Sequence, residues 1–230
     1  RALLFLLVLV FSLPTAAKPA VLSWACVERG EPYCYADAQG RPAGLVVRLI
    51  EEIGRELGIR VQTELLPWAR AQAMVREGRI DLLVTLPTQE RFAYAYFGRE
   101  ALAVEPMRLF LRQGQPGLAA QLRGMKRLED LRSIQLVTYL GDGYAAQYLN
   151  PGFKLQQMAR PENIPLMLLN GRAQASLVNL TLFQRWILDQ KLTPTDFEQI
   201  ELDWPHTQLP RLFMLSRRSA WHQQGLLKAM

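Results

Sequence analysis

The side chains best suited to covalent, acid–base or metal chemistry are few in this sequence of 230 residues. There are two cysteines, Cys26 and Cys34, and two histidines, His206 and His222, which come late in the chain. Because the histidines lie far from the cysteines, no set with the spacing of metal ligands is present. The sequence also has no G-x-S-x-G turn and no phosphate-binding glycine loop. We therefore expect neither a metal nor a cofactor, and a binding function rather than catalysis.

The two cysteines are close enough in the sequence to form a disulfide. An even pair of this kind is typical of exported proteins, whose compartments are oxidising. The short loop closed between Cys26 and Cys34 would stabilise the fold by about 2–3 kcal/mol on the chain-entropy estimate. Two free, buried thiols are the alternative, and both interpretations stand at this point.

The framework that must position any site begins with alternating strands and helices. Apolar side chains recur at helical spacing in some segments and along short strand-like runs in others. The expected elements are a strand over Val21–Val27, a helix over Gly44–Gly58, a strand over Arg60–Leu66, a helix over Trp68–Glu77 closed by Gly78, and a strand over Ile80–Leu86. This β-α-β-α-β order favours a mostly parallel sheet flanked by helices.

A weak internal repeat indicates two similar halves. Met74–Leu86 and Met167–Leu180 each predict a helix, a Gly-Arg stop and a buried strand, with Met, Gly and Arg at identical offsets. Later strands are expected at Ser133–Leu140 and Arg211–Leu215, and a helix from Trp221 onward. The second half therefore begins and ends inside the first, which predicts two strands that cross between the lobes.

The expected lobe boundaries follow from turn-rich segments. Gln113–Gly117 is rich in glycine and proline, and Pro194–Pro210 holds turns and polar residues. We predict a first lobe over residues 18–112 plus 208–230 and an inserted second lobe over 113–207.

The N-terminus has the pattern of an export signal. Arg1 precedes a nearly unbroken apolar run from Ala2 to Leu13, and small residues allow cleavage after Ala17. The apolar run is shorter than the roughly 20 residues that span a bilayer, although a retained anchor is the alternative. We predict a signal peptide over residues 1–17. At the other end, Leu226–Met230 stops within an apparent helix pattern, so we expect a continuation beyond it.

The charge pattern argues against nucleic acid as a partner. The formal net charge is +6, but no run of Lys or Arg exceeds two residues and basic positions are scattered among acidic ones. Nucleic-acid-binding domains concentrate their basic residues in a patch or stripe. We expect a solvated, mildly basic surface instead.

Three short motifs stand in a fixed order along the chain. They are Pro32–Tyr35 followed by Gly40 and Gly44, Pro67–Arg70 running to Gly78 and Asp81, and Thr88–Arg91 followed by Phe97. Together they resemble the extracellular solute-binding protein family 3, the polar amino-acid-binding branch of the type II periplasmic binding proteins. The resemblance covers about Val21 to Leu215, and the order and spacing of the motifs are more specific than any one of them. The resemblance implies an α/β, two-lobed fold with two hinge strands and a ligand cleft between the lobes.

In the first lobe, the resemblance assigns ligand contacts to five side chains. Arg91 matches the arginine that grips the α-carboxylate of the ligand, which suits the paired donors of a guanidinium. Trp68 matches the aromatic residue that packs on the ligand, and Thr85 and Thr88 stand where they could complete the grip on the carboxylate. Tyr33 is expected at the cleft wall. The alternatives are a surface ion pair for Arg91 and a core position for Trp68.

In the second lobe, the resemblance points to Asp142, Gly143 and Asn179. Gly141-Asp142-Gly143 matches a loop that opens a helix, and free N–H groups at a helix start favour an anion. Asp142 would repel a carboxylate there but would attract an ammonium group. Relatives that bind α-amino acids usually carry an acid at the position of Asn179, and a neutral amide makes a weaker hydrogen bond. A small carboxylate or amino-acid-like metabolite is therefore the ligand class we expect.

The function implied by the resemblance is solute capture in the periplasm. Lobe closure over the ligand would be recognised by an ABC-type permease of the inner membrane, and we expect a monomer. One alternative is a ligand-sensing module of a larger receptor or cell-wall enzyme. A less favoured alternative is a dehydratase-like enzyme on the same fold.

Overall fold

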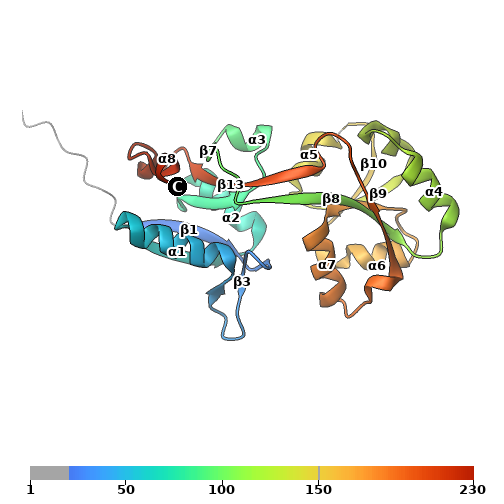
Figure 1. The fold of residues 1–230 in the computed structure, drawn as a ribbon, viewed down its shortest axis with the longest axis horizontal. Helices are drawn as coiled ribbons and strands as arrows, with labels where there is room; N and C mark the ends of the chain where they lie inside the picture. Colours follow the sequence, from blue (N-terminus) through green and yellow to red (C-terminus); the bar gives the residue numbers. More distant parts are fainter. Residues whose placement is uncertain (1–20, 150) are drawn as a thin grey trace, which may run out of the picture.

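The computed structural model describes residues 21–149 and 151–230. The predicted signal peptide lies outside this part of the chain. The described residues form two lobes side by side, with two long strands running between them (Figure 1). No helix in the described part is long and apolar enough to cross a membrane.

The first lobe is a sheet flanked by helices. β1 (Val21–Val27) pairs in parallel with β5 (Arg60–Leu66) and β6 (Leu82–Thr85). β13 (Gln208–Ser216) runs antiparallel to β6 and to β7 (Ala95–Phe97). The helices are α1 (Leu45–Leu57), α2 (Trp68–Glu77), α3 (Gln89–Phe92) and α8 (Leu226–Ala229). α1 turns Val46, Val47 and Ile50 into the core, which explains its helical spacing of apolar residues.

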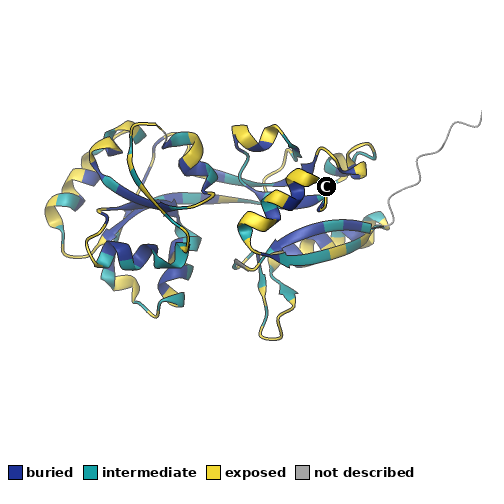
Figure 2. Cartoon of the chain, turned by 180° about the vertical axis from the view of Figure 1, so that it is seen from behind, coloured by how far each residue is buried: buried dark blue, intermediate teal, exposed yellow. Residues whose placement is uncertain are grey.

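The second lobe repeats this construction. β9 (Gln135–Tyr139) pairs in parallel with β10 (Lys154–Met158) and bridges in parallel to the residue before β11 (Ser176–Asn179). β11 and β12 (Phe197–Glu201) run antiparallel to β8 (Ala103–Arg112). The helices are α4 (Pro116–Gly124), α5 (Gly143–Tyr148), α6 (Ile164–Leu169) and α7 (Leu180–Asp189). Buried residues concentrate along the sheets of both lobes, while the outer faces of the helices are exposed (Figure 2).

The crossing between the lobes is made by β8 and β13. They pair with each other only at Ala103–Pro106 and Gln208–Arg211. Beyond this stretch, Met107–Arg112 pairs with strands of the second lobe and Leu212–Leu215 with β6 of the first. The prediction of a two-lobed α/β fold with two hinge strands is confirmed.

The first crossing lies earlier in the chain than the boundary predicted after residue 112. Met107–Arg112 belongs to the sheet of the second lobe. The turn-rich segment that suggested the boundary marks the end of β8. β8 continues as a strand through Pro106 at the crossing, so the crossing has no loop of its own.

A small three-stranded arm projects from the first lobe beside the cleft. It consists of β2 (Arg29–Gly30), β3 (Cys34–Ala36) and β4 (Pro42–Ala43). Cys26 of β1 is bonded to Cys34 of β3, with Cα atoms 5.5 Å apart. Both cysteines are buried. The disulfide ties the arm to the central sheet and fixes the position of the neighbouring Tyr33.

Candidate functional site

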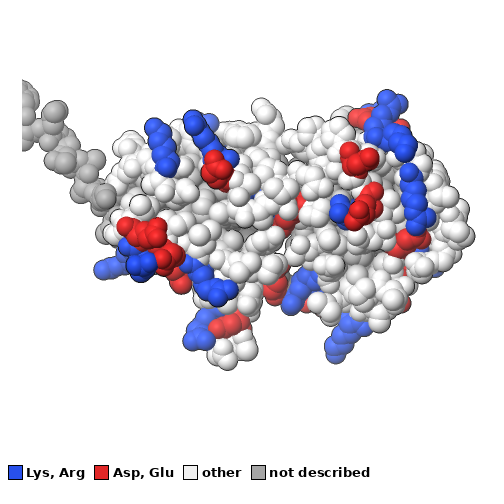
Figure 3. All heavy atoms as spheres, viewed as in Figure 1, with Lys and Arg blue, Asp and Glu red and all other residues white. Residues whose placement is uncertain are grey.

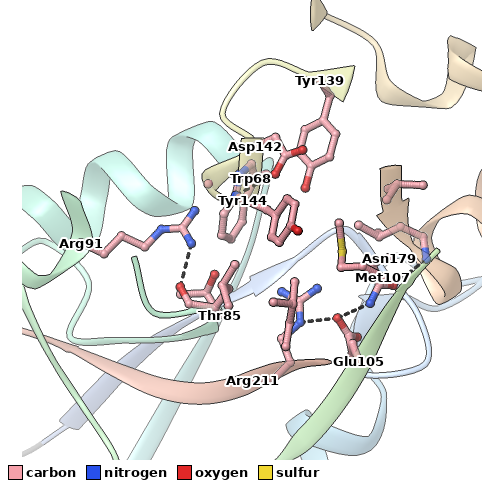
Figure 4. A pocket seen from close by; sticks show the side chains of 15 residues that line it. Trp68, Thr85, Arg91, Glu105, Met107, Tyr139, Asp142, Tyr144, Asn179 and Arg211 are labelled. Carbon is pink, nitrogen blue, oxygen red and sulfur yellow. Dashed lines mark hydrogen bonds and ion pairs between the residues drawn. The ribbon is translucent and has the colours of Figure 1, made fainter. Parts of the chain in front are cut away.

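Two neighbouring cavities lie between the lobes. The smaller, of about 40 Å³, is called here the head pocket and is lined by residues that include Trp68, Thr85, Arg91, Asp142 and Gly143 (Figure 4). The larger, of about 460 Å³, is called the chamber and includes Tyr33 and Trp186. The residues that line both are Trp68, Glu105, Tyr139, Asn179, Leu182 and Arg211. The head pocket has room for one functional group, and the chamber has the volume of a small-molecule site.

The structure brings nearly all the predicted site residues to these cavities. Tyr33 lines the chamber, Asn179 and Trp68 line both cavities, and the others line the head pocket. Thr88 is the exception. Its hydroxyl accepts a hydrogen bond from the backbone N–H of Arg91 at 3.3 Å and caps α3. Thr88 therefore orients the helical turn that carries Arg91 and does not reach the cavity.

Arg91 is buried, with 3% of its surface exposed. Its Nε and Nη2 donate to Gln72 Oε1 at 3.1 and 2.9 Å, and its Nη1 donates to the Leu86 carbonyl at 2.8 Å. Its Cζ lies 5.1 Å from the centre of the Trp68 ring. Burial lowers the pKa of the guanidinium from its ordinary value. The alternative of a surface ion pair does not apply, because within residues 21–149 and 151–230 no carboxylate forms an ion pair with Arg91.

Part of the Arg91 guanidinium remains available for a ligand. A guanidinium has five N–H groups, and the structure shows hydrogen bonds from three of them. One N–H on each Nη atom is left, and this pair suits a carboxylate. A buried cation without a counter-ion is costly, so an anion that enters the head pocket gains a favourable partner.

Two buried hydroxyl groups of the head pocket have no hydrogen-bond partner in the described chain. They are Thr85 Oγ1, at the end of β6, and the Tyr144 hydroxyl, on α5. These residues are 1% and 2% exposed. Buried polar groups are almost always hydrogen-bonded in native proteins. A polar ligand in the head pocket would give these two hydroxyl groups a hydrogen-bond partner.

The carboxylate of Asp142 already accepts hydrogen bonds from the start of α5 and from Thr138. Its Oδ1 accepts the backbone N–H groups of Tyr144 and Ala145 at 2.9 and 3.2 Å, and its Oδ2 accepts from Thr138 Oγ1. Asp142 is therefore the N-cap of α5. Burial raises its pKa, although these hydrogen bonds act in the opposite direction.

Gly143 of the second lobe lies against the guanidinium of Arg91 in the first lobe. A Cβ atom at this position would lie 2.8, 2.9 and 3.0 Å from Nη2, Nη1 and Cζ of Arg91. The absence of a side chain thus lets the start of α5 rest on the guanidinium. Two hydrogen bonds join the lobes nearby: Trp68 Nε1 donates to the Gly141 carbonyl at 3.2 Å, and Gln89 N to Gln147 Oε1 at 3.0 Å.

Asn179 lines both cavities and also caps a helix. Its Oδ1 accepts the Leu182 N–H at 3.0 Å, which caps α7, and its Nδ2 donates to Glu105 Oε2 at 2.7 Å. The side chain is buried, with 4% of the residue exposed. Its amide therefore lies beside the carboxylate of Glu105, and both side chains line the two cavities.

Glu105 and Arg211 are site residues that the sequence analysis did not identify. They lie on the two hinge strands, and Arg211 Nε donates to Glu105 Oε2 at 2.6 Å. Burial and the neighbouring charge of Glu105 raise the pKa of Tyr33. The available signal was an isolated acid within the strand Ala103–Arg112, where an exposed position was the simpler expectation.

A second ion pair joins the two lobes at the chamber. Arg185 Nη1 on α7 lies 3.3 Å from Glu31 Oε1 of the first lobe, and Arg185 Nη2 lies 3.0 Å from Asp189 Oδ1 of the same helix. Glu31 and Arg185 come from opposite lobes and both line the chamber. This interaction therefore holds the lobes together at the end of the cleft away from Arg91.

Comparison with solved structures shows that the fold is shared with several binding domains. The substrate-binding protein of an amino acid ABC transporter is 16% identical with a TM-score of 0.66, covering 91% of this chain and 89% of that chain. A histidine kinase sensor domain similar to periplasmic binding proteins is 20% identical with a TM-score of 0.73, covering 92% and 88%. Holo ArgBP from T. maritima is 17% identical with a TM-score of 0.66, covering 91% and 87%. At these identities the likeness concerns the fold alone.

The family is shown by the sequence itself. No curated protein matches the chain. However, the family model of bacterial extracellular solute-binding proteins, family 3, matches residues 22–217, which include both lobes and both hinge strands. The resemblance predicted from the motifs is therefore confirmed, and the chain belongs to the bacterial extracellular solute-binding proteins, family 3.

Proposed function

We propose that this protein captures a small carboxylate or amino-acid-like metabolite in the cleft between its lobes. The observation that carries the proposal is the buried guanidinium of Arg91, which has no ion-pair partner in the described chain and keeps an N–H free on each Nη atom. Thr85 supplies a buried hydroxyl without a partner in the same pocket. A carboxylate would satisfy these groups together.

Closure of the lobes would complete the site. The ligand first binds one lobe, and the strands β8 and β13 then bend until α5 approaches Arg91. The contacts from Gly141, Gly143 and Gln147 to the first lobe are those of a closed form. Ligand binding shifts the balance toward this form only by as much as the closed state binds more tightly.

The role that follows is solute capture in the periplasm and delivery to an ABC-type permease of the inner membrane. A monomer with no cofactor and no catalytic step suffices for it. The family and the solved relatives support a binding function. Charges of both signs are scattered over the face shown in Figure 3, without a large patch of one sign.

A ligand-sensing module is the second candidate. The likeness of the fold to a histidine kinase sensor domain favours it. Both candidates require the same binding event in the cleft. They differ in whether a permease or a signalling domain recognises the closed form. A permease that couples transport to this protein would support delivery, and a signalling output that depends on the ligand would support sensing.

Thermal unfolding with a panel of amino acids and small carboxylates tests the binding function. A ligand at about 100 times its dissociation constant adds about 2.7 kcal/mol to the free energy of unfolding. Arg91→Ala should weaken binding of that ligand by about 100-fold, as expected for loss of a charge-assisted hydrogen-bond pair. Arg76→Ala is the matched control, because Arg76 is exposed and pairs with Glu90 on the surface. Affinity of Arg91→Ala within a few-fold of the wild type would refute the site.

A further inference from the structure

The head pocket offers many hydrogen-bond donors to a ligand. Arg91 keeps one N–H on each Nη atom. Arg211 uses only its Nε, toward Glu105, and both of its Nη groups have no partner in the described chain. Thr85 and Tyr144 add buried hydroxyl groups without partners. The cationic groups of the pocket thus have N–H groups to spare.

The anionic groups of the same pocket are engaged by the protein. Asp142 accepts three hydrogen bonds as the cap of α5. Glu105 accepts hydrogen bonds from Asn179 and Arg211 on its Oε2 atom. The Asn179 oxygen caps α7. An ammonium group needs acceptors, preferably charged ones, and each of these already serves a donor of the chain.

The terminal N–H groups of Arg211 are available to a ligand, because its ion pair within the hinge uses only Nε. Glu105, 3% exposed, holds the guanidinium by its Nε, which leaves the terminal end of Arg211 at the boundary between the head pocket and the chamber. Its side chain is 24% exposed. Figure 4 shows Arg211 and Arg91 in the same pocket. The charge of Arg211 is close enough to contribute to lowering the pKa of Arg91.

We propose that the ligand carries two carboxylate groups and no ammonium group, with one carboxylate on Arg91 and Thr85 and the other on the terminal N–H groups of Arg211. The proposal rests on the proposed function and narrows its ligand class to dicarboxylic acids. One carboxylate fills the head pocket, and the second lies at the junction with the chamber. Two anions between two guanidinium groups leave the protein's carboxylates with the partners they already have.

The test is calorimetric titration of the mature protein with matched ligands. Straight-chain dicarboxylates from malonate to adipate are compared with monocarboxylates of the same carbon number, with aspartate and glutamate, and with arginine. Aspartate and glutamate keep both carboxylates and add only the ammonium group. We expect one dicarboxylate to bind about 10- to 100-fold more tightly than its monocarboxylate, as one further charge-assisted contact provides. We also expect it to bind at least tenfold more tightly than its amino acid counterpart.

The double variant Glu105→Gln with Arg211→Gln tests the second anchor. It removes both charges, so it leaves no buried carboxylate without its arginine. We expect the ratio of monocarboxylate to dicarboxylate dissociation constants to fall to near one. Arg108→Gln with Glu201→Gln is the control, because it removes another Arg–Glu pair, between β8 and β12, that lines neither cavity. Melting temperatures without ligand show that each variant folds.

Each other outcome contradicts the proposal in a distinct way. If an α-amino acid binds more tightly than the dicarboxylate of the same length, the ligand class is wrong while capture of a carboxylate by Arg91 stands. If the Glu105/Arg211 variant weakens mono- and dicarboxylates equally, Arg211 is not a carboxylate anchor. If no carboxylate of the panel binds, the further inference and the proposed function both fail.

Discussion

Neutral groups hold the buried charge of Arg91 in position. Gln72 and the Leu86 carbonyl accept its hydrogen bonds, and Trp68 and Gly143 pack against it. A carboxylate in their place would form a permanent ion pair, and separating a buried pair costs about 3–5 kcal/mol. Dipoles orient the guanidinium without neutralising it. The charge therefore stays available to a ligand.

Gly143→Ala tests whether the start of α5 must rest on Arg91. The added Cβ would meet the guanidinium at 2.8–3.0 Å, and overpacking of this kind costs about 1–3 kcal/mol. The cost falls on the closed form only, because opening separates the two residues. We expect the affinity for the captured ligand to fall by about tenfold or more, measured by calorimetric titration.

The control for this change is Gly117→Ala. Gly117 also lies at the beginning of a helix, and a Cβ there would have no atom within 4 Å. Its affinity should equal that of the wild type. Equal affinities for Gly143→Ala and Gly117→Ala would mean that the lobes close without contact between α5 and Arg91.

At the scale of elements, helix starts account for residues that the sequence assigned to the ligand. Thr88, Asp142 and Asn179 cap α3, α5 and α7. Asp, Asn and Thr are favoured both as helix caps and as polar contacts, so residue type alone does not separate the two roles. The structure shows that all three side chains cap helices and that Asp142 and Asn179 also line the head pocket, so their contact with a ligand stays a prediction.

Asp142 should make the stability of the protein depend on pH in a defined direction. Burial raises its native pKa above the ordinary carboxyl value of about 4. The native state then binds more protons than the unfolded state between the two pKa values. The stability contributed by Asp142 is present below the unfolded value and is lost as the pH rises through the native value. Asp142→Asn keeps a capping oxygen but does not titrate.

Urea unfolding of the wild type and Asp142→Asn, from below the unfolded pKa of Asp142 to above its native pKa, measures this pH dependence of stability. The free energy of unfolding of the wild type should fall relative to that of Asp142→Asn as the pH rises. Asp142→Ala should lose about 1 kcal/mol with the cap. A wild type that gains stability relative to Asp142→Asn over the interval would show that the hydrogen bonds outweigh burial.

The internal repeat correctly predicted a helix, a Gly-Arg stop and a strand in each lobe. Arg79 N donates to Met74 O and Arg172 N to Met167 O, both at 2.9 Å, so the two Gly-Arg stops close their helices in the same way. Gly78 and Gly171 both have positive φ there, which glycine adopts easily. Each stop leads to a strand, β6 or β11, that ends at the cleft. Local patterns of this kind determine local structure, which is why they could be predicted.

The two crossing strands were predicted, but the place of the first crossing and the residues paired across the hinge were not. β8 continues as a strand through Pro106 at the crossing, and the Glu105–Arg211 pair joins positions that are far apart in sequence. The predicted strand Arg211–Leu215 is also shorter than β13, which begins at Gln208. Pairing between distant strands depends on tertiary contacts. The second arginine of the pocket was missed for this reason.

At the scale of the whole molecule, polar contacts join the described parts of the two lobes at both ends of the cleft. The hinge strands join them through backbone pairing, α5 meets Arg91 and Trp68 at one end of the cleft, and Arg185 meets Glu31 at the other. The clusters of buried core residues are separate in the two lobes, with Leu86 of the first lobe packed against a cluster of the second. The lobes therefore do not share a continuous buried core, which suits a hinge motion.

Glu31→Gln tests the contact at the far end of the cleft. Both side chains are partly exposed, at 36% for Arg185 and 24% for Glu31, so the pair contributes less than about 1 kcal/mol to folding. Arg185 keeps Asp189 as a partner. We expect unchanged unfolding, a larger radius of gyration in X-ray scattering without ligand, and affinity lower by a few-fold, because the closed form alone contains the pair.

A cycle with Arg185→Gln separates this effect from direct contact with the ligand. If the pair acts by holding the lobes together, Glu31→Gln, Arg185→Gln and the double variant weaken binding by similar amounts, since each removes the same interaction. Glu198→Gln is the control, because its partner Arg123 lies in the same lobe. Additive losses in the double variant would instead mean that both side chains touch the ligand. A loss no larger than that of Glu198→Gln would mean that closure is set by the hinge and α5 alone.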